Sequence, residues 1–250
     1  MALLVMLPAA LGLPLSALHL GRPFLAMTAM KNIKTSWLSR EALALGVFTA
    51  LMSSVVGAYF FEVNAALRLA LEALTLAIGV YGIYAQSMIY RIKARPSWDR
   101  ITTNFKFFGV SYIGMFLVAF ISSLSTLHEA IVPLTTLGML GALAQLFFTY
   151  EDTRTLDDKE NEYQLQRTKR LLNENFKKIK LLRLVSLVFG GVVLPLLALV
   201  MITSSLNATS AILFVVLVVV FVSEISDRFL FYTTVVPLGM AGGFFVGKQR

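Results

Sequence analysis

The sequence predicts an all-α integral membrane protein. Of its 250 residues, 57% are hydrophobic and 14% are charged, and the mean hydropathy is +0.76. The apolar residues come in runs of about 20, the length that a helix needs to cross a bilayer. Strands of a membrane barrel would alternate apolar and polar residues over about ten positions, and these runs do not alternate. We therefore expect a bundle of membrane-spanning helices.

Seven segments are apolar and long enough to span the membrane. At a rise of about 1.5 Å per residue, each covers a hydrocarbon core of about 30 Å. They comprise residues 2–19, 42–61, 66–89, 106–124, 130–149, 184–204 and 210–234. Because the spans continue along the whole sequence, residues 1–250 are predicted to form a single transmembrane domain.

The connections between the spans alternate between basic and neutral. The first, third and fifth contain clusters of Lys and Arg, whereas those around Val63, Thr126 and Leu206 contain none. Cytoplasmic loops carry the excess of positive residues, so the basic face is predicted to be cytoplasmic, with the N-terminus outside. The net charge of +8 is explained by topology and anionic lipid, and nucleic-acid binding is not expected.

The fifth connection, residues 150–183, is polar and partly amphipathic. Its apolar residues Leu165, Leu172, Phe176 and Ile179 fall near one helical stripe, with Lys and Arg on the opposite side. This pattern predicts a helix at the membrane surface or an extension of the sixth span. A solvated connector and a docking element for a partner are both compatible with it.

The composition excludes several cofactors from this chain. It has no cysteine and only two histidines, so it has no thiolate ligands for iron–sulfur clusters or zinc. The second histidine, His128, lies in the fourth connection, on the opposite face from His19, which argues against a haem held by two histidines. The sequence also lacks the ligand spacings of a catalytic metal site and the glycine fingerprints of nucleotide binding.

Ionisable residues inside or beside the spans are costly unless they are paired or hydrated. His19 ends the first span and Glu41 begins the second, while Glu224 and Arg228 interrupt the last. The spacing of Glu224 and Arg228 predicts either a supporting ion pair or the lining of a wet cavity. The alternating topology brings all four residues to or toward the basic face.

His19 and Glu41 flank a loop that also supplies Trp37. An imidazole, a carboxylate and an aromatic ring together suit a quinol headgroup, which needs hydrogen-bond acceptors, a flat stacking surface and a route for protons. The predicted quinol-binding residues are His19, Arg22, Trp37, Arg40, Glu41 and Trp98. Glu224 and Arg228 are assigned a supporting role, and no catalytic or metal-binding residue is expected.

Several of these segments resemble the membrane anchor subunit of the dimethyl sulfoxide reductase family. The similarity rests on LHLGRP followed by SWLSRE, on RPSW, on LLRLVSL and on SEISDRFLFYTTVVPLGMA, in this order along the chain. The resemblance implies a prokaryotic inner-membrane anchor that oxidises menaquinol during anaerobic respiration. Its implied partners are an iron–sulfur electron-transfer subunit and a molybdopterin catalytic subunit.

In that family, the histidine of HLG and the glutamate that follows are implicated in quinol binding, and these map onto His19 and Glu41. The family usually has eight spans, which implies that a further helix, one span before HLGRP, is absent from this sequence. An eight-span topology places the HLG end in the periplasm, whereas the charge bias places it in the cytoplasm. Two other functions stay open: a secondary transporter or proton-conducting protein using Glu72, Glu224 and Arg228, and a structural assembly protein.

Overall fold

A computed structural model describes residues 32–157 and 162–238. These ranges contain six helices that are long and apolar enough to cross a membrane and contain no strand. The expected all-α membrane fold is therefore confirmed. Six of the seven predicted spans correspond to these helices. The remaining one, the first span at residues 2–19, lies outside the described residues. The chain divides into two compact units, residues 1–90 and 91–250.

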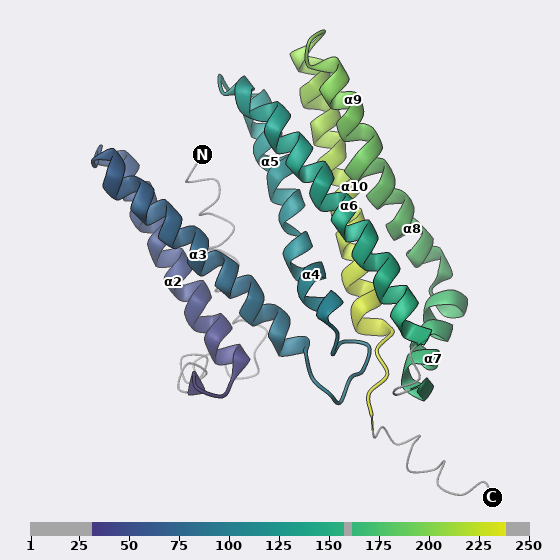
Figure 1. The fold of residues 1–250 in the computed structure, drawn as a ribbon. Coiled ribbons are helices and arrows are strands. Elements are labelled where there is room, and N and C mark those ends of the chain that lie inside the picture. Colours follow the sequence, from purple (N-terminus) through teal and green to yellow (C-terminus); the bar gives the residue numbers. More distant parts are fainter. Residues whose placement is uncertain (1–31, 158–161, 239–250) are drawn as a thin grey trace, which may run out of the picture. The chain divides into compact units, whose positions relative to one another are not determined.

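The described part of the first unit is a helical hairpin. Helix α2 (Trp37–Phe60) and helix α3 (Ala65–Tyr90) lie side by side along their length (Figure 1). The side chain of Ser36 caps α2 by accepting a hydrogen bond from the amide of Ser39. The turn between the helices is tight, and Glu62 adopts a positive φ of 50° there. The hairpin thus places Glu41 and Glu62 at opposite ends.

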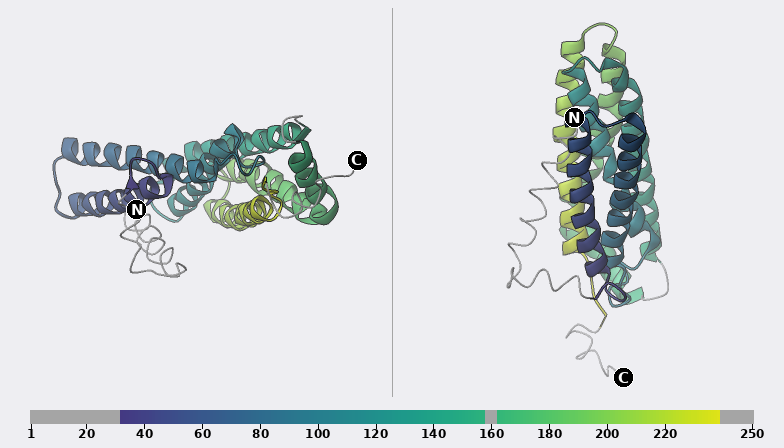
Figure 2. Two further views of the ribbon diagram at one scale, coloured as in Figure 1. Left: turned by 90° about the horizontal axis from the view of Figure 1, so that it is seen from below. Right: turned by 90° about the vertical axis from the view of Figure 1, so that its left-hand side faces the viewer.

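The described part of the second unit contains four spans. The first is α4 (Ile101–Gly109) with α5 (Ser111–Ser123), and the second is α6 (Ile131–Arg154), which follows the short helix η2 (His128–Ala130). The third is α8 (Lys177–Val188), the π-helical turn η5 (Phe189–Val193) and α9 (Leu194–Met201), and the fourth is α10 (Leu206–Thr233). Figures 1 and 2 show these spans running roughly parallel or antiparallel to one another.

The core of the second unit lies where α5, α6, α8 and α10 meet. It is formed by the fully buried residues Tyr112, Phe116, Ala142, Leu187, Val216 and Val220. Small residues permit this close approach, as is common in membranes, where packing rather than water exclusion holds helices together. A Cβ atom added to Gly141 would lie 2.6 Å from Cβ of Tyr112, and one added to Gly191 would lie 2.5 Å from Cβ of Ala142.

The polar connector of residues 150–183 is largely helical. It consists of the end of α6, η3 (Thr155–Asp157), α7 (Glu162–Arg170), the π-helical turn η4 (Leu171–Asn175) and the beginning of α8. Its apolar stripe faces the unit itself. Leu165 is buried, and the ring of Phe176 packs edge-on against Phe229 of α10, with the ring centroids 5.6 Å apart. The connector therefore contributes to the basic end of the second unit.

Candidate functional site

The predicted site residues fall into both units. His19 and Arg22 lie outside the described residues. Trp37, Arg40 and Glu41 occupy the first turns of α2, whereas Trp98 precedes α4, and Glu224 and Arg228 lie on α10.

Glu41 is a half-buried carboxylate inside a membrane span. Its side chain is hydrogen-bonded to the amide of Gln86 from α3. None of the ion pairs between described residues includes Glu41. A carboxylate at the end of a span that is paired with a neutral amide is well suited to accept a proton, because no cation among the described residues forms an ion pair with it.

The neighbouring Arg40 points away from this carboxylate. Its Nε donates to the carbonyl of Ile33 at 2.9 Å, and its Nη2 donates to the carbonyl of Lys34 at 2.7 Å. The guanidinium carbon also lies 4.2 Å from the centre of the Trp37 ring. Arg40 therefore ties the preceding turn to the start of α2 and holds Trp37 by a cation–π contact.

Trp37 contacts α3 as well as Arg40. Its ring meets that of Tyr84 edge to face, with the centroids 5.6 Å apart and the planes at 88°. We call Trp37, Arg40, Glu41, Tyr84 and Gln86 the Glu41 patch. It combines a proton acceptor, an amide that can donate and accept hydrogen bonds, and two aromatic rings, all at the end of the hairpin that follows the HLGRP loop in sequence.

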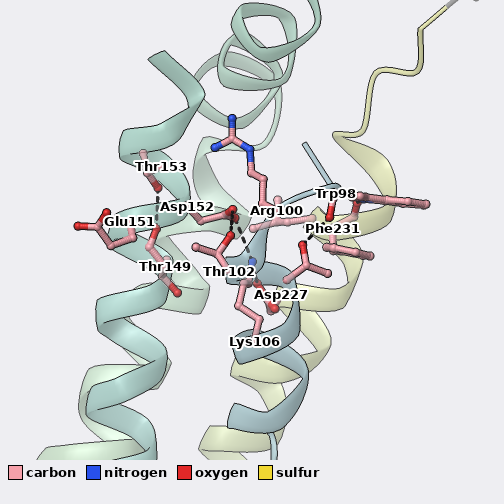
Figure 3. Close-up of polar contacts among 12 residues, drawn as sticks. Trp98, Arg100, Thr102, Lys106, Thr149, Glu151, Asp152, Thr153, Asp227 and Phe231 are labelled. Atoms are coloured by element: carbon pink, nitrogen blue, oxygen red, sulfur yellow. Dashed lines mark hydrogen bonds and ion pairs between the residues drawn. The ribbon is translucent and has the colours of Figure 1, made fainter. Parts of the chain in front are cut away.

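The second unit contains a buried charge cluster, formed by Lys106 on α4, Asp152 on α6, Arg183 on α8, and Glu224 and Asp227 on α10. Asp227 is its centre. Oδ1 of Asp227 lies 3.0 Å from Nη1 of Arg183 and 3.3 Å from Nζ of Lys106. The Lys106 amine also lies 3.3 Å from Oδ2 of Asp152, so it sits between two carboxylates (Figure 3). These ion pairs link four helices.

Glu224 belongs to the same cluster but has no ion-pair partner within the described ranges. The hydroxyl of Tyr112 on α5 donates to its Oε1 at 3.0 Å. Its other oxygen, Oε2, is buried without a hydrogen-bond partner among the described residues. Glu224 is therefore held by a neutral group, in contrast to Asp227.

The ion pair expected between Glu224 and Arg228 is not formed. The guanidinium of Arg228 instead lies 4.1 Å from the centre of the Phe107 ring on α4. Helical spacing places both residues on adjoining parts of one face, but the half-buried Arg228 turns toward the aromatic ring while Glu224 points to Tyr112. Among the described residues, the ion pairs that join α10 to α4 and α8 are those of Asp227.

Trp98 holds the end of α10. It is 5% exposed, its Nε1 donates to the carbonyl of Phe231 at 2.9 Å, and its ring stacks on that of Phe231 with the centroids 4.8 Å apart. Arg95 covers the indole ring, its guanidinium lying 4.2 Å from the ring centre. Figure 3 shows the stacked pair beside the charge cluster. These contacts favour a structural role for Trp98 over contact with a quinol ring.

A cavity of about 60 Å³ opens at this end of the second unit. Its walls include Lys106, Asp152, Arg183 and Asp227 of the cluster, together with Trp98 and several hydroxyl side chains. Residues 32–157 and 162–238 contain no group of three or more His, Asp or Glu side chains arranged to hold a metal ion. The groups gathered here are therefore suited to binding water and exchanging protons.

A family model described as DMSO reductase anchor subunit (DmsC) matches residues 1–234 of the chain. The chain belongs to this family. Its resemblance to the dimethyl sulfoxide reductase anchors is thereby confirmed, and the six described spans agree with membership. Among curated proteins, this DmsC-family chain is 34% identical over 163 residues to a subunit of the sulfite dehydrogenase of Allochromatium vinosum. The aligned region covers 54% of this chain and 47% of that protein. No solved structure matches the chain.

Sequence reasoning missed most of the charge cluster of this DmsC-family protein. Asp227 was visible as a charge inside the last span, but neither Lys106 nor Asp152 was selected as part of a site. The available signal was Lys106 itself, a single cation in the otherwise uncharged stretch ITTNFKFFGVSYIGMF. A lone cation within a span requires a partner, yet sequence spacing cannot identify a partner that lies on another helix.

Proposed function

We propose that this protein is the quinol-oxidising membrane anchor of a molybdopterin oxidoreductase, and that quinol binds at the Glu41 patch. The observation that carries the proposal is Glu41, a carboxylate in a membrane span of a DmsC-family chain that is hydrogen-bonded to Gln86 and has no ion pair among the described residues. Such a residue is expensive to place in a membrane and is usually functional.

In this proposal, menaquinol enters from the lipid and its hydroxyls face Glu41 and His19. Oxidation to menaquinone releases two protons and two electrons. Glu41 and His19 accept or relay the protons, Trp37 lies against the quinol ring, and Arg40 keeps Trp37 in position through its cation–π contact. Arg22, close to His19 in sequence, completes the predicted set.

The electrons require a partner. The sequence has no cysteine, so it cannot ligate an iron–sulfur cluster. We propose that an iron–sulfur subunit receives the electrons and passes them to a molybdopterin subunit. The family is named for the anchor subunit of a DMSO reductase, and the similar curated protein is a subunit of a sulfite dehydrogenase. Both descriptions suit an anchor that exchanges electrons with a quinone pool, while the catalytic subunit chooses the terminal substrate. The proposed location is the cytoplasmic membrane of a prokaryote.

Glu41→Gln in the complete complex tests this proposal, because the amide keeps the shape of the side chain but cannot accept a proton. We expect the rate of turnover with a menaquinol analogue to fall by about 10²-fold or more, the contribution typical of a positioned general base. Activity driven by a reduced dye that donates directly to the iron–sulfur subunit should be unchanged.

Glu62→Gln is the matched control. Glu62 is an exposed carboxylate in the turn at the other end of the same hairpin, so its replacement should leave both activities at the wild-type level. If Glu41→Gln retained wild-type quinol turnover in an assembled complex, Glu41 would not be the proton acceptor and the quinol site would have to be sought elsewhere.

A further inference from the structure

The cavity of about 60 Å³ at the basic end of the second unit is large enough for several water molecules, since one water needs about 10–15 Å³ of such space. It lies among α4, α6, α7, α8 and α10 and reaches Lys106, Arg183 and Asp227 of the buried charge cluster. This site belongs wholly to the second unit and is independent of the Glu41 patch.

Buried polar atoms around this cavity lack partners. The Arg183 side chain is 7% exposed and uses Nη1 for Asp227, but its Nε and Nη2 have no hydrogen-bond partner among the described residues, and neither does Oγ of Ser97. Both residues line the cavity. An unsatisfied buried donor costs about 1–3 kcal/mol, so water molecules in the cavity are needed to satisfy these atoms.

The lining offers both donors and acceptors of hydrogen bonds. The hydroxyls of Thr149, Thr153 and Thr168 donate to backbone carbonyls, which leaves their oxygen lone pairs as acceptors on the cavity wall. Asp152 and Asp227 add carboxylate oxygens that accept hydrogen bonds, and Lys106, Lys180 and Arg183 add cationic donors. Since Arg183 and Ser97 require acceptors and the threonines require donors, the ligand must both donate and accept hydrogen bonds, as water does.

Glu224 lies on α10, three residues before Asp227, and does not itself line the cavity. The ionisable groups that act on it are Tyr112 from α5, Arg183 from α8, and Asp227 and Arg228 from α10. The neighbouring α9 and η5 contain no charged residue. Two cations hold Asp227 in the ionised form, whereas Glu224 has only the Tyr112 hydroxyl and one unpaired oxygen. Glu224 is therefore the carboxyl of the cluster that can change its protonation.

The polar groups around the cavity also reach the protein surface. The Asp152 side chain is 29% exposed and contacts Lys106, which in turn contacts Asp227. Ion pairs thus connect the partly exposed Asp152 through Lys106 and Asp227 to Arg183, whose charge acts on Glu224. Groups coupled in this way through water can transfer protons between solvent and a buried carboxyl.

We propose that Glu224 is a proton-exchanging site that is loaded from the basic face through the water-filled cavity. In the forward step, a hydronium ion in the cavity releases a proton, which is passed through hydrogen-bonded water to the Glu224 carboxylate, leaving water and a neutral carboxylic acid. In the reverse step, the acid returns the proton to the cavity water. Asp227 stays paired with Arg183 and Lys106 throughout.

Infrared difference spectroscopy tests this proposal on the chain purified from its membranes together with its partner subunits. A change of buffer pH should produce a carboxylic-acid C=O band in the wild-type protein that disappears in Glu224→Gln. Transfer to D₂O should shift this band. Asp152→Asn should slow this shift about tenfold, equivalent to about 1.4 kcal/mol in the barrier. The reason is that the substitution removes the charge of the carboxylate closest to solvent.

Asp157→Asn provides the matched control. Asp157 is a 55% exposed acid near the end of α6 that does not line the cavity, and its replacement should change neither the band nor the rate of its shift. The proposal would be overturned by a wild-type band that is absent, unaffected by pH, unaffected by D₂O, or equally strong in Glu224→Gln. These measurements need no quinol, so they stand or fall separately from the proposed quinol site.

Discussion

Asp227 determines how the last helix is held in the second unit. It is 2% exposed, and a single oxygen, Oδ1, is near both Arg183 and Lys106. Ion pairs of this kind add little net stability compared with apolar packing, because both partners must be removed from water. They nevertheless specify which helices meet, since an unpaired charge at this position would be strongly unfavourable.

Asp227→Ala should therefore destabilise the protein by about 3–5 kcal/mol, because it leaves the buried Arg183 guanidinium without an ion-pair partner among the described residues. The apparent melting temperature in detergent provides the measurement. Asp157→Ala removes an exposed partner of Lys169 and should cause little change. Equal effects of the two substitutions would show that the Asp227 pairs do not contribute to stability.

At this scale the sequence identified charged residues more reliably than their partners. The position of Glu224 inside a span predicted that its side chain would need a partner or water, and the structure buries this side chain. Its expected partner, Arg228, was chosen from the spacing along one helix, whereas its actual partner, Tyr112, is separated from it by 112 residues. Periodicity describes one helix at a time, so contacts between helices cannot be read from it.

The helices extend beyond the apolar segments that predicted them. The segment 106–124 corresponds to a helical span of residues 101–123, and the segment 130–149 to residues 128–157. Hydropathy locates the part of a helix that lies in hydrocarbon, but backbone hydrogen bonds continue into polar turns at the basic end. Thr102 and Asp152, which are hydrogen-bonded to each other at 3.0 Å, lie in these added turns.

The helix is interrupted between α4 and α5, and a side chain of α6 hydrogen-bonds to the backbone just before this break. The side-chain amide of Gln145, which is fully buried, donates to the carbonyl of Lys106 at 2.9 Å. A break in a membrane helix is tolerated where a neighbouring helix satisfies the freed backbone group. Gln145 therefore supports the segment that presents Lys106 to the charge cluster.

Two glycines in neighbouring helices test how tightly these elements pack. Gly141→Ala on α6 places a methyl group 2.6 Å from Cβ of Tyr112 and should cost about 1–3 kcal/mol through overpacking. Gly114→Ala on α5 meets no atom within 4 Å and should be neutral, or stabilising by up to about 1 kcal/mol, because alanine favours the helix.

Apparent melting temperatures of the two glycine variants in the same detergent would measure the difference. A wild-type melting temperature for Gly141→Ala would contradict the close approach of α5 and α6. Since Tyr112 is also the hydrogen-bond partner of Glu224, this variant should in addition weaken the infrared band assigned above to Glu224.

At the scale of the whole molecule, the connections between the spans alternate between neutral and basic. The turns at residues 61–64, 124–127 and 202–205 contain no Lys or Arg, whereas the connections at 91–100 and 162–180 are basic. Glu41 lies in the first turns of α2, beside a basic connection, and the cavity of the proposed proton-exchanging site lies at the basic end of the second unit. The orientation of the chain therefore decides from which compartment each site exchanges protons.

The positive-inside rule predicts that the basic connections are cytoplasmic, and the absence of cysteine makes this directly measurable. Lys93→Cys and Ser204→Cys introduce single thiols at exposed positions that are separated by three spans of the second unit and are therefore predicted to face opposite sides of the membrane. A membrane-impermeant maleimide should label Lys93→Cys in inverted membrane vesicles and Ser204→Cys in intact spheroplasts. Labelling after solubilisation in detergent controls for the reactivity of each thiol. The reverse pattern would place the basic face outside, and both sites would then release or take up protons on the periplasmic side.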